Sequence, residues 1–264
     1  MNVRGAVVIV TGASMGLGAS TARLLAQQGA RVALAARSRE RLEALSEELP
    51  EAFASPVDIR DHEAITRMVA AVYDRYGQID ALINIAGQGM HGFLEQIEVS
   101  QYRLLMDINL YGPLRIMQAV IPLMRQQRGG LILNVSAPLG RMPFLPSLGA
   151  YASTKAALTV MTLTARAELA ADNIRVGAVY PGMMATSMSA HLLPASTVGP
   201  VTTAWEAGAD LPPGAPRPNS PDIVAGDLLK AFEREDPEYF TEGFLQLAAW
   251  AKGMEGEGRQ GGAH

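Results

Sequence analysis

The stretch VVIVTGASMGLG, residues 7–18, places a glycine cluster between an apolar run and the start of a helical pattern. Its first four residues are β-branched and apolar, which predicts a buried β-strand. Glycines permit a tight turn and a close ligand approach, and the N-terminus of the following helix favours negative charge. A glycine cluster in this place is therefore strong evidence for a turn that binds a phosphate group. The alternative is an ordinary connecting turn.

Short β-branched runs alternate with longer helical patterns along most of the chain. Strands are expected at residues 7–10, 31–36, 53–57, 80–83, 131–135 and 174–179. Helices are expected at residues 17–28, 39–49, 61–77, 101–127 with an interruption at 112–113, 150–171, 222–232 and 242–252. Strands that are apolar on both faces and separated by helices indicate a parallel sheet with helices on both sides. With right-handed crossovers, the prediction is a single α/β domain over residues 1–254, with a doubly wound, Rossmann-like sheet.

The alternation stops after Pro181, and residues 187–221 hold seven prolines and three glycines. Long irregular segments inside compact domains are often lids or binding loops, so we expect a substrate lid here. The last residues, 255–264, are polar and rich in glycine, which predicts a flexible tail.

The composition limits the classes of protein to which this chain can belong. Its 264 residues are 48% hydrophobic and carry a formal net charge of -4, so a basic surface for nucleic acid is not expected. It has no cysteine and only four scattered histidines, so no disulfide and no metal site are predicted. No apolar run reaches the ~20 residues of a membrane span. We expect a cytoplasmic protein with a small-molecule partner, and neither nucleic acid nor membrane as a partner.

Several motifs, in the same order, resemble those of the short-chain dehydrogenase/reductase (SDR) family over residues 5–240. They are the T-G-x-x-x-G-x-G of residues 11–18, the N-I-A-G of residues 84–87 where the family has N-N-A-G, Asn109 in the long helical segment, the Y-x-x-x-K of Tyr151 and Lys155, and Pro181-Gly182 with Thr186. The resemblance implies an oxidoreductase that transfers a hydride between a nicotinamide cofactor and a carbonyl or alcohol. The expected cofactor-binding residues are Gly12, Ser14, Met15, Gly16, Leu17, Gly18, Arg37, Ser38, Asp58, Ile59, Asn84, Ala86, Gly87, Tyr151, Lys155, Pro181, Gly182, Met184 and Thr186.

The end of the second strand distinguishes between the two nicotinamide dinucleotides. An NAD site needs an acid there to accept a hydrogen bond from the ribose 2′-hydroxyl. This chain has Ala36 followed by Arg37, and an arginine fork can pair with a 2′-phosphate. Ser38 is a candidate further donor, whereas Met15 stands where many NADP-dependent members have a basic residue. We therefore expect NADP(H), with a solvated charge at a helix start as the alternative reading of Arg37. Asp58 resembles the family's adenine-edge acceptor, and its alternative is a loop acid or helix cap.

The resemblance makes Tyr151, Lys155 and Asn109 catalytic residues. It implies that Tyr151 hands a proton to the substrate oxygen, that Lys155 also binds the nicotinamide ribose, and that Asn109 holds a water in a proton relay. Tyr151 and Lys155 are four residues apart and share a helix face. A phenol has a pKa near 10, and we expect the neighbouring ammonium to lower it toward neutral pH.

The segment NVSA, residues 134–137, departs from the family's N-x-S-S because Ala137 replaces the serine that bonds the substrate oxygen. Three readings stay open. Ser136 is one catalytic candidate, although in a regular strand it faces the other way and more readily holds a neighbouring backbone. Another group, such as Ser147 or a water, is the second. In the third, the protein is a slow enzyme, or an NADP(H)-binding sensor or scaffold with weakened catalysis.

Apolar side chains gather after the strand ends and in the late segment, where ligands enter such sheets. They are Met90, His91 as a polar neighbour, Phe93, Met142, Phe144, Met183, Met184, Met188, Leu192, Leu193 and Trp205. The leading hypothesis is therefore an NADPH-dependent reductase of apolar carbonyl compounds, with NAD-dependent alcohol oxidation as a lesser alternative. The resemblance also implies a homodimer or homotetramer that packs the helices of residues 101–127 and 150–171.

Overall fold

A computed structural model describes residues 1–142, 145–184, 192–196 and 214–260, with residues 253–260 as backbone only. Its centre is a seven-stranded parallel sheet in the order β3-β2-β1-β4-β5-β6-β7. The strands are β1 (Val7–Thr11), β2 (Arg31–Ala36), β3 (Ala52–Pro56), β4 (Ala81–Asn84), β5 (Gly130–Val135), β6 (Ile174–Tyr180) and β7 (Glu238–Phe240). The strand order reverses between β1 and β4, and open α/β sheets bind their ligands at such a switch point.

The predicted fold class is confirmed, and each of the six predicted strands lies within one residue of its observed bounds. The seventh strand, β7, was not predicted. It has only three residues and pairs in parallel with the end of β6. A run of this length shows no usable periodicity, so only the position of its neighbours defines it.

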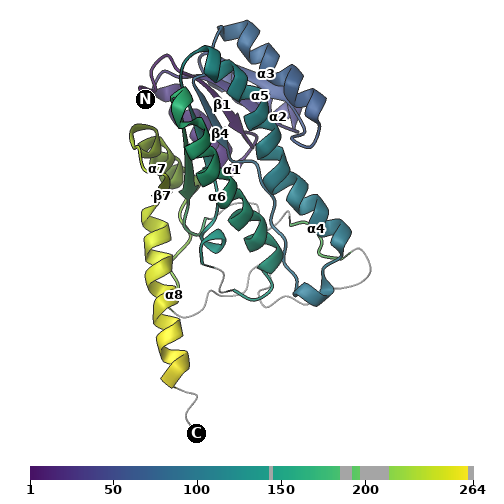
Figure 1. Ribbon diagram of the computed structural model, residues 1–264, viewed down its shortest axis with the longest axis vertical. Coiled ribbons are helices and arrows are strands. Elements are labelled where there is room, and N and C mark those ends of the chain that lie inside the picture. The colour runs from purple at the N-terminus through teal and green to yellow at the C-terminus, as the bar shows by residue number, and fades with distance from the viewer. Residues whose placement is uncertain (143–144, 185–191, 197–213, 261–264) are drawn as a thin grey trace.

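Helices cover both faces of the sheet (Figure 1). One face carries α1 (Gly16–Gln27), α2 (Arg39–Glu48) and α7 (Pro221–Glu233), and the other carries α3 (His62–Tyr76), α5 (Gly112–Gln126) and α6 (Gly149–Leu169). Successive strand residues point to opposite faces. Val8 and Val10 accordingly pack with the first set of helices, and Val7 and Ile9 with the second.

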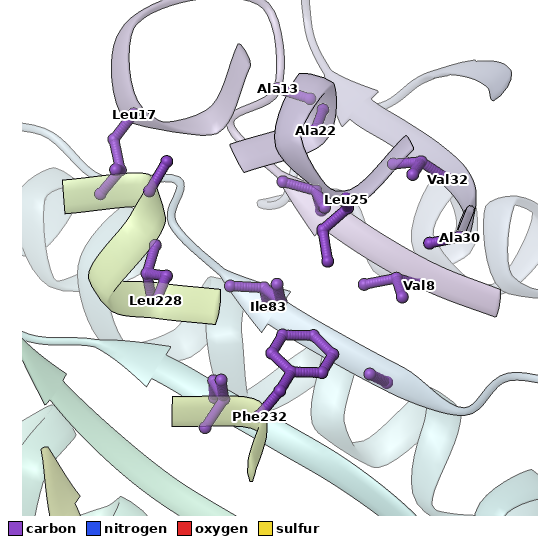
Figure 2. Close-up of a cluster of buried hydrophobic side chains, with 14 of the residues drawn as sticks. Val8, Ala13, Leu17, Ala22, Leu25, Ala30, Val32, Ile83, Leu228 and Phe232 are labelled. Carbon is purple, nitrogen blue, oxygen red and sulfur yellow. The ribbon is translucent and has the colours of Figure 1, made fainter. Parts of the chain in front are cut away.

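The first of these layers is shown in Figure 2. Leu25 of α1 meets Leu228 and Phe232 of α7 above the strand residues Val8 and Ile83. All five side chains are buried, and burying each large one contributes about 1.5–3 kcal/mol. Because α1 also carries the glycine turn at its N-terminus, this layer holds that turn against the sheet.

The long helical pattern of residues 101–127 divides into α4 (Val99–Met106), the π-helical turn η2 (Asp107–Tyr111) and α5. The expected interruption at 112–113 is displaced, because Gly112 and Pro113 form the first turn of α5, where proline is tolerated. The irregular turn lies just before them and contains Asn109. A π-turn inside a helix often marks a functional site.

The last helix, α8, runs from Glu242 to Gln260 and extends beyond the sheet (Figure 1). The flexible tail expected from residue 255 stays a prediction, and residues 261–264 lie outside the described part. Of the predicted lid, only residues 192–196 and 214–221 are described. None of the described helices is both long and apolar enough to cross a bilayer.

Candidate active site

The glycine turn after β1 has the geometry of an anion site. Gly12 and Gly16 have positive φ angles of 71° and 52°, which glycine adopts without strain. At Gly18 a Cβ atom would lie 2.1 Å from the carbonyl oxygen of Gly12, so α1 can start this close to the turn only with glycine there. Met15, the N-cap residue, makes no side-chain cap, and the first turn of α1 has no acid. The first N–H groups of α1 and its dipole therefore favour a bound anion.

A second loop, residues 84–87, packs directly against this turn. The Thr11 hydroxyl accepts hydrogen bonds of 3.0 Å from the backbone N–H of both Ile85 and Ala86. A Cβ on Gly12 would lie 2.9 Å from the nitrogen of Ala86. Thr11 was not among the predicted site residues, although it is the first letter of the glycine motif. It couples the loop ends of β1 and β4 across the switch point.

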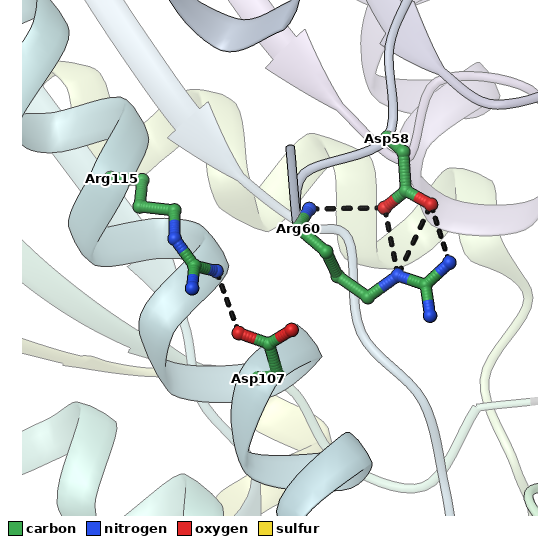
Figure 3. Close-up of polar contacts among 4 residues, drawn as sticks. All are labelled: Asp58, Arg60, Asp107 and Arg115. Atoms are coloured by element: carbon green, nitrogen blue, oxygen red, sulfur yellow. Dashed lines mark hydrogen bonds and ion pairs between the residues drawn. The ribbon is translucent and has the colours of Figure 1, made fainter. Parts of the chain in front are cut away.

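Charged residues surround the end of β2 and β3. Arg60 forms a fork on Asp58, with its Nη2 atom 2.6 Å from Oδ2, and a separate pair joins Arg115 to Asp107 at 2.7 Å (Figure 3). The hydrogen bond from Arg60 lowers the pKa of Asp58 below its ordinary value against the effect of burial, and the charge of the exposed Arg37 adds to the lowering. The guanidinium groups of Arg37 and Arg60 thus both act on the Asp58 carboxylate.

Lys155 and Asn109 meet at Gly87. A Cβ on Gly87 would lie 3.3 Å from both the Asn109 Oδ1 atom and the Lys155 Nζ atom, so this glycine lets both side chains close on the loop. Lys155 is buried, and its ammonium donates to the carbonyl oxygen of Val135 at 3.0 Å. Asn109 is also buried. Its Nδ2 atom donates to the backbone oxygen of Gln88 and to the Thr154 hydroxyl, and its Oδ1 atom accepts from the N–H of Gln88.

The protonation of the tyrosine–lysine pair differs from the expectation. Desolvation raises the pKa of Tyr151 to about 12 and lowers the pKa of Lys155 to about 8. Burial therefore shifts the Tyr151 pKa in the direction opposite to the lowering expected from the Lys155 ammonium. Near neutral pH, Tyr151 is a neutral phenol and therefore a proton donor.

The loop after β5 lies against the catalytic helix. The Ser136 hydroxyl donates to the carbonyl oxygen of Lys155 at 3.1 Å and pairs with the Thr159 hydroxyl at 2.9 Å. These are the backbone-holding contacts that strand alternation indicates, so its contacts do not favour the catalytic role predicted for Ser136. Ala137 is buried next to it and has no hydroxyl. On the following turn, η3 (Pro138–Gly140), a Cβ on Gly140 would lie only 2.8 Å from the carbonyl carbon of Lys155.

Several other residues predicted to bind the cofactor make contacts within the protein itself. Asn84 is buried and donates to the Asn134 Oδ1 atom at 2.8 Å, which joins β4 to β5. The N–H of Gly182 donates to the Thr241 hydroxyl, and Met184 pairs in a β-bridge with Asn219. Ile59 packs under Gly112. Their contacts with a cofactor stay predictions, and Thr186 lies outside the described residues.

The predicted pocket residues do not form one group. Met90 and Leu193 form a β-bridge and pack in the same apolar cluster as Tyr151. Met142 lies elsewhere, beside Tyr180 and Phe244. Phe144, Met188 and Trp205 lie outside the described residues. The structure thus brings apolar side chains to Tyr151 from two segments that are distant in sequence.

Comparisons with known proteins agree with this geometry. The family model for short chain dehydrogenases matches residues 6–196. The 3-oxoacyl-(acyl-carrier-protein) reductase FabG of Thermotoga maritima is 37% identical over 197 residues, which are 73% of this chain and 79% of that protein. An uncharacterized oxidoreductase of Staphylococcus epidermidis is 34% identical over 188 residues, 71% of this chain and 81% of that protein. A crystal structure of a short chain dehydrogenase from Burkholderia cenocepacia in complex with NADP has a TM-score of 0.77 at 30% identity, with 99% of this chain and 98% of that chain covered. The protein therefore belongs to the short-chain dehydrogenase/reductase family.

Proposed function

We propose that the protein is an NADP(H)-dependent oxidoreductase that reduces apolar ketones or aldehydes. The observation that carries the proposal is the cluster of Lys155, Asn109 and Gly87 on the helix face of Tyr151. This cluster adjoins the loop that Thr11 holds against the glycine turn. A proton donor and an anion site are thus built at the same end of the sheet.

A nicotinamide dinucleotide fits the residues present. The glycine turn and the uncapped N-terminus of α1 suit its pyrophosphate, and the exposed guanidinium of Arg37 after β2 suits a 2′-phosphate rather than a free hydroxyl. The relative from Burkholderia cenocepacia, solved with NADP, supports this choice. When bound, the cofactor supplies the hydride for the reaction. The ammonium of Lys155 retains donors beyond its bond to Val135, and these can bind the ribose hydroxyls.

Tyr151 is the proposed general acid. Its pKa of about 12 keeps the phenol protonated near neutral pH, which is the form needed for reduction and not for alcohol oxidation. In the balanced reaction, the carbonyl carbon gains a hydride and its oxygen gains the Tyr151 proton. The C=O π-bond breaks, C–H and O–H bonds form, the carbonyl is reduced and the dinucleotide is oxidised. A proton from solvent then restores the phenol, and we propose that Asn109 helps to place the water that delivers it.

The apolar cluster around Tyr151 supports an apolar carbonyl compound as substrate. The test is the initial rate of oxidation of NADPH and of NADH by the purified protein with acetophenone, benzil and benzaldehyde, together with identification of the alcohol product. We expect turnover with at least one of them, and kcat/KM for NADPH at least ~10-fold above that for NADH, as one charge-assisted contact supplies. Equal use of both cofactors would contradict the NADP(H) assignment.

A second candidate function is an NADP(H)-binding sensor or scaffold with weakened catalysis. It is favoured by Ala137, which has no hydroxyl, and by Ser136, whose hydroxyl is bonded to α6. Tight NADPH binding with no turnover of any carbonyl compound would select this candidate. Turnover that is lost in Tyr151→Phe would exclude it.

We also propose that the protein is a homodimer or homotetramer in the cytoplasm. The location rests on the cysteine-free composition. The assembly is supported by a groove between the outer sides of α5 and α6, lined by Leu114, Met117, Gln118, Ile121, Pro122, Arg125, Met161, Thr164, Ala165, Glu168 and Leu169. Light scattering after size-exclusion chromatography should give a multiple of 28.1 kDa, and Met161→Glu should lower it. A monomeric wild type would contradict the assembly.

A further inference from the structure

The backbone of Ser147 has an unusual conformation for its position. Its φ angle is 63°, in the left-handed region that non-glycine residues seldom adopt. The other described non-glycine residues with positive φ are Glu51, Arg128 and Asn173. Those three lie just after helices, where this conformation is common, whereas Ser147 lies just before α6. Backbone strain of this kind gathers at functional sites, where the surrounding structure maintains it.

The Ser147 hydroxyl has no hydrogen-bond partner in the part of the chain that the structure describes. The residue is only 6% exposed, and its Oγ atom is buried without a hydrogen bond. A serine beside the start of a helix ordinarily caps it, but the N-cap position of α6 is Leu148 and no side chain caps the helix. Buried polar side chains almost always have a partner. Neither capping nor a core hydrogen bond therefore explains this hydroxyl.

The backbone of Ser147 contacts the segment that follows β4, and the residue lies just before the start of α6. Its carbonyl oxygen accepts from the N–H of Gly92 at 2.8 Å, which ties it to the segment that follows β4. At the start of that segment, Gln88 makes hydrogen bonds with both ends of the Asn109 amide. Four residues after Ser147, in the first turn of α6, lies Tyr151.

The centre also lacks a donor, since Ala137 has no hydroxyl and the Ser136 hydroxyl contacts Lys155 and Thr159. We propose that Ser147 supplies this donor: its hydroxyl hydrogen-bonds the substrate carbonyl oxygen while Tyr151 gives that oxygen its proton. The inference rests on the proposed reductase activity. Negative charge grows on the oxygen as the carbon accepts hydride, and a fixed donor stabilises that charge. The Ser147 proton stays on its own oxygen throughout.

The test separates the hydroxyl from the backbone conformation. Ser147→Gly removes the hydroxyl and suits positive φ, and Ser147→Ala removes the hydroxyl while keeping the strain. Both should lower kcat/KM for the best of the three carbonyl probes by ~10²-fold, the effect of one lost donor. Both should leave the NADPH Kd, measured by fluorescence, within about twofold. Because the lost hydroxyl is buried without a partner, Ser147→Gly should not lower Tm.

The matched control is Arg128→Gly, which relieves positive φ away from the site and should leave kcat/KM unchanged. The double variant with Ala137→Ser and Ser147→Gly should have a kcat/KM at least ~10-fold above that of Ser147→Gly alone. The reason is that position 137 is where the family has its donor serine. If Ser147→Gly keeps kcat/KM within threefold of wild type, or lowers Tm, the inference is overturned while the reductase assignment stands. A wild type that binds NADPH but reduces none of the probes overturns both.

Discussion

Gly140→Ala is expected to displace the catalytic lysine without removing any polar group of the site. Gly140 has no positive φ, so alanine fits its backbone, and the whole effect is steric. Its Cβ would lie 2.8 Å from the Lys155 carbonyl carbon and 3.0 Å from the Lys155 Cβ and carbonyl oxygen. The turn η3 and helix α6 must then separate at the residue whose ammonium meets Gly87 and Asn109.

The size of the effect follows from these distances. Non-bonded carbons rest at about 3.5–4.0 Å, so the 2.8 Å contact must open by about 0.7 Å or more. A displacement of about 1 Å at a catalytic centre can cost ~10²-fold in rate, and we expect kcat to fall by ~10–100-fold. Overpacking should also cost about 1–3 kcal/mol of stability. NADPH binding should change less than kcat, because the glycine turn follows β1, whereas η3 follows β5, and β4 lies between these two strands.

The assay is the steady-state oxidation of NADPH with a carbonyl probe, well below the Tm of each variant, beside urea unfolding and the NADPH Kd. The control is Gly226→Ala in α7, where a Cβ meets nothing within 4 Å. It should stabilise the protein by about 0.5–1 kcal/mol with unchanged kcat. If Gly140→Ala keeps kcat within twofold and unfolds like wild type, the contact between η3 and Lys155 does not position the lysine.

Three further predictions concern the cofactor, pH and the core. Arg37→Ala should weaken NADPH binding by ~10–100-fold and leave NADH binding unchanged, as titration calorimetry can show; equal losses for both would refute it. Because burial lowers the Lys155 pKa from 10.5 to about 8, the unfolded chain binds more protons at this residue between about pH 8 and pH 10. The unfolding free energy of wild type should therefore rise with pH relative to Lys155→Met, by up to ~1.4 kcal/mol per pH unit, and parallel pH profiles in urea would refute it. Phe232→Ala should cost about 3–5 kcal/mol in the same assay, and a loss under 1 kcal/mol would mean that α7 is not held by this layer.

The sheet was predictable because most of its strands are buried on both faces. In β1 (Val7–Thr11) every residue is β-branched and the first four are apolar, and the glycine cluster fixes the end of this strand. The short strand β7 and the π-turn around Asn109 were not predictable. Strand β7 exists only because it pairs with β6. The π-turn changes the backbone hydrogen bonds of residues 107–111, but the helical pattern of the sequence continues through them.

The candidate site was predictable in its residues and less so in its energetics. The spacing of Tyr151 and Lys155 places them on one helix, but it gives no measure of how deeply the fold buries them. The direction of the Tyr151 pKa shift follows from that burial and was predicted with the wrong sign. Strand alternation did indicate the side to which Ser136 points, whereas the contacts of Thr11 depend on how two loops pack.

The most direct test of the central claim is the Tyr151→Phe variant, which removes one oxygen and keeps the ring in its apolar cluster. NADPH binding and the rate of NADPH oxidation with a carbonyl probe are to be measured on the same preparations of wild type and variant. The account predicts an NADPH Kd within about twofold of wild type and a loss of ~10²–10⁴-fold in kcat/KM, the range of a lost general acid. A variant that still reduces the probe at the wild-type rate would contradict the assignment of Tyr151 as the proton donor.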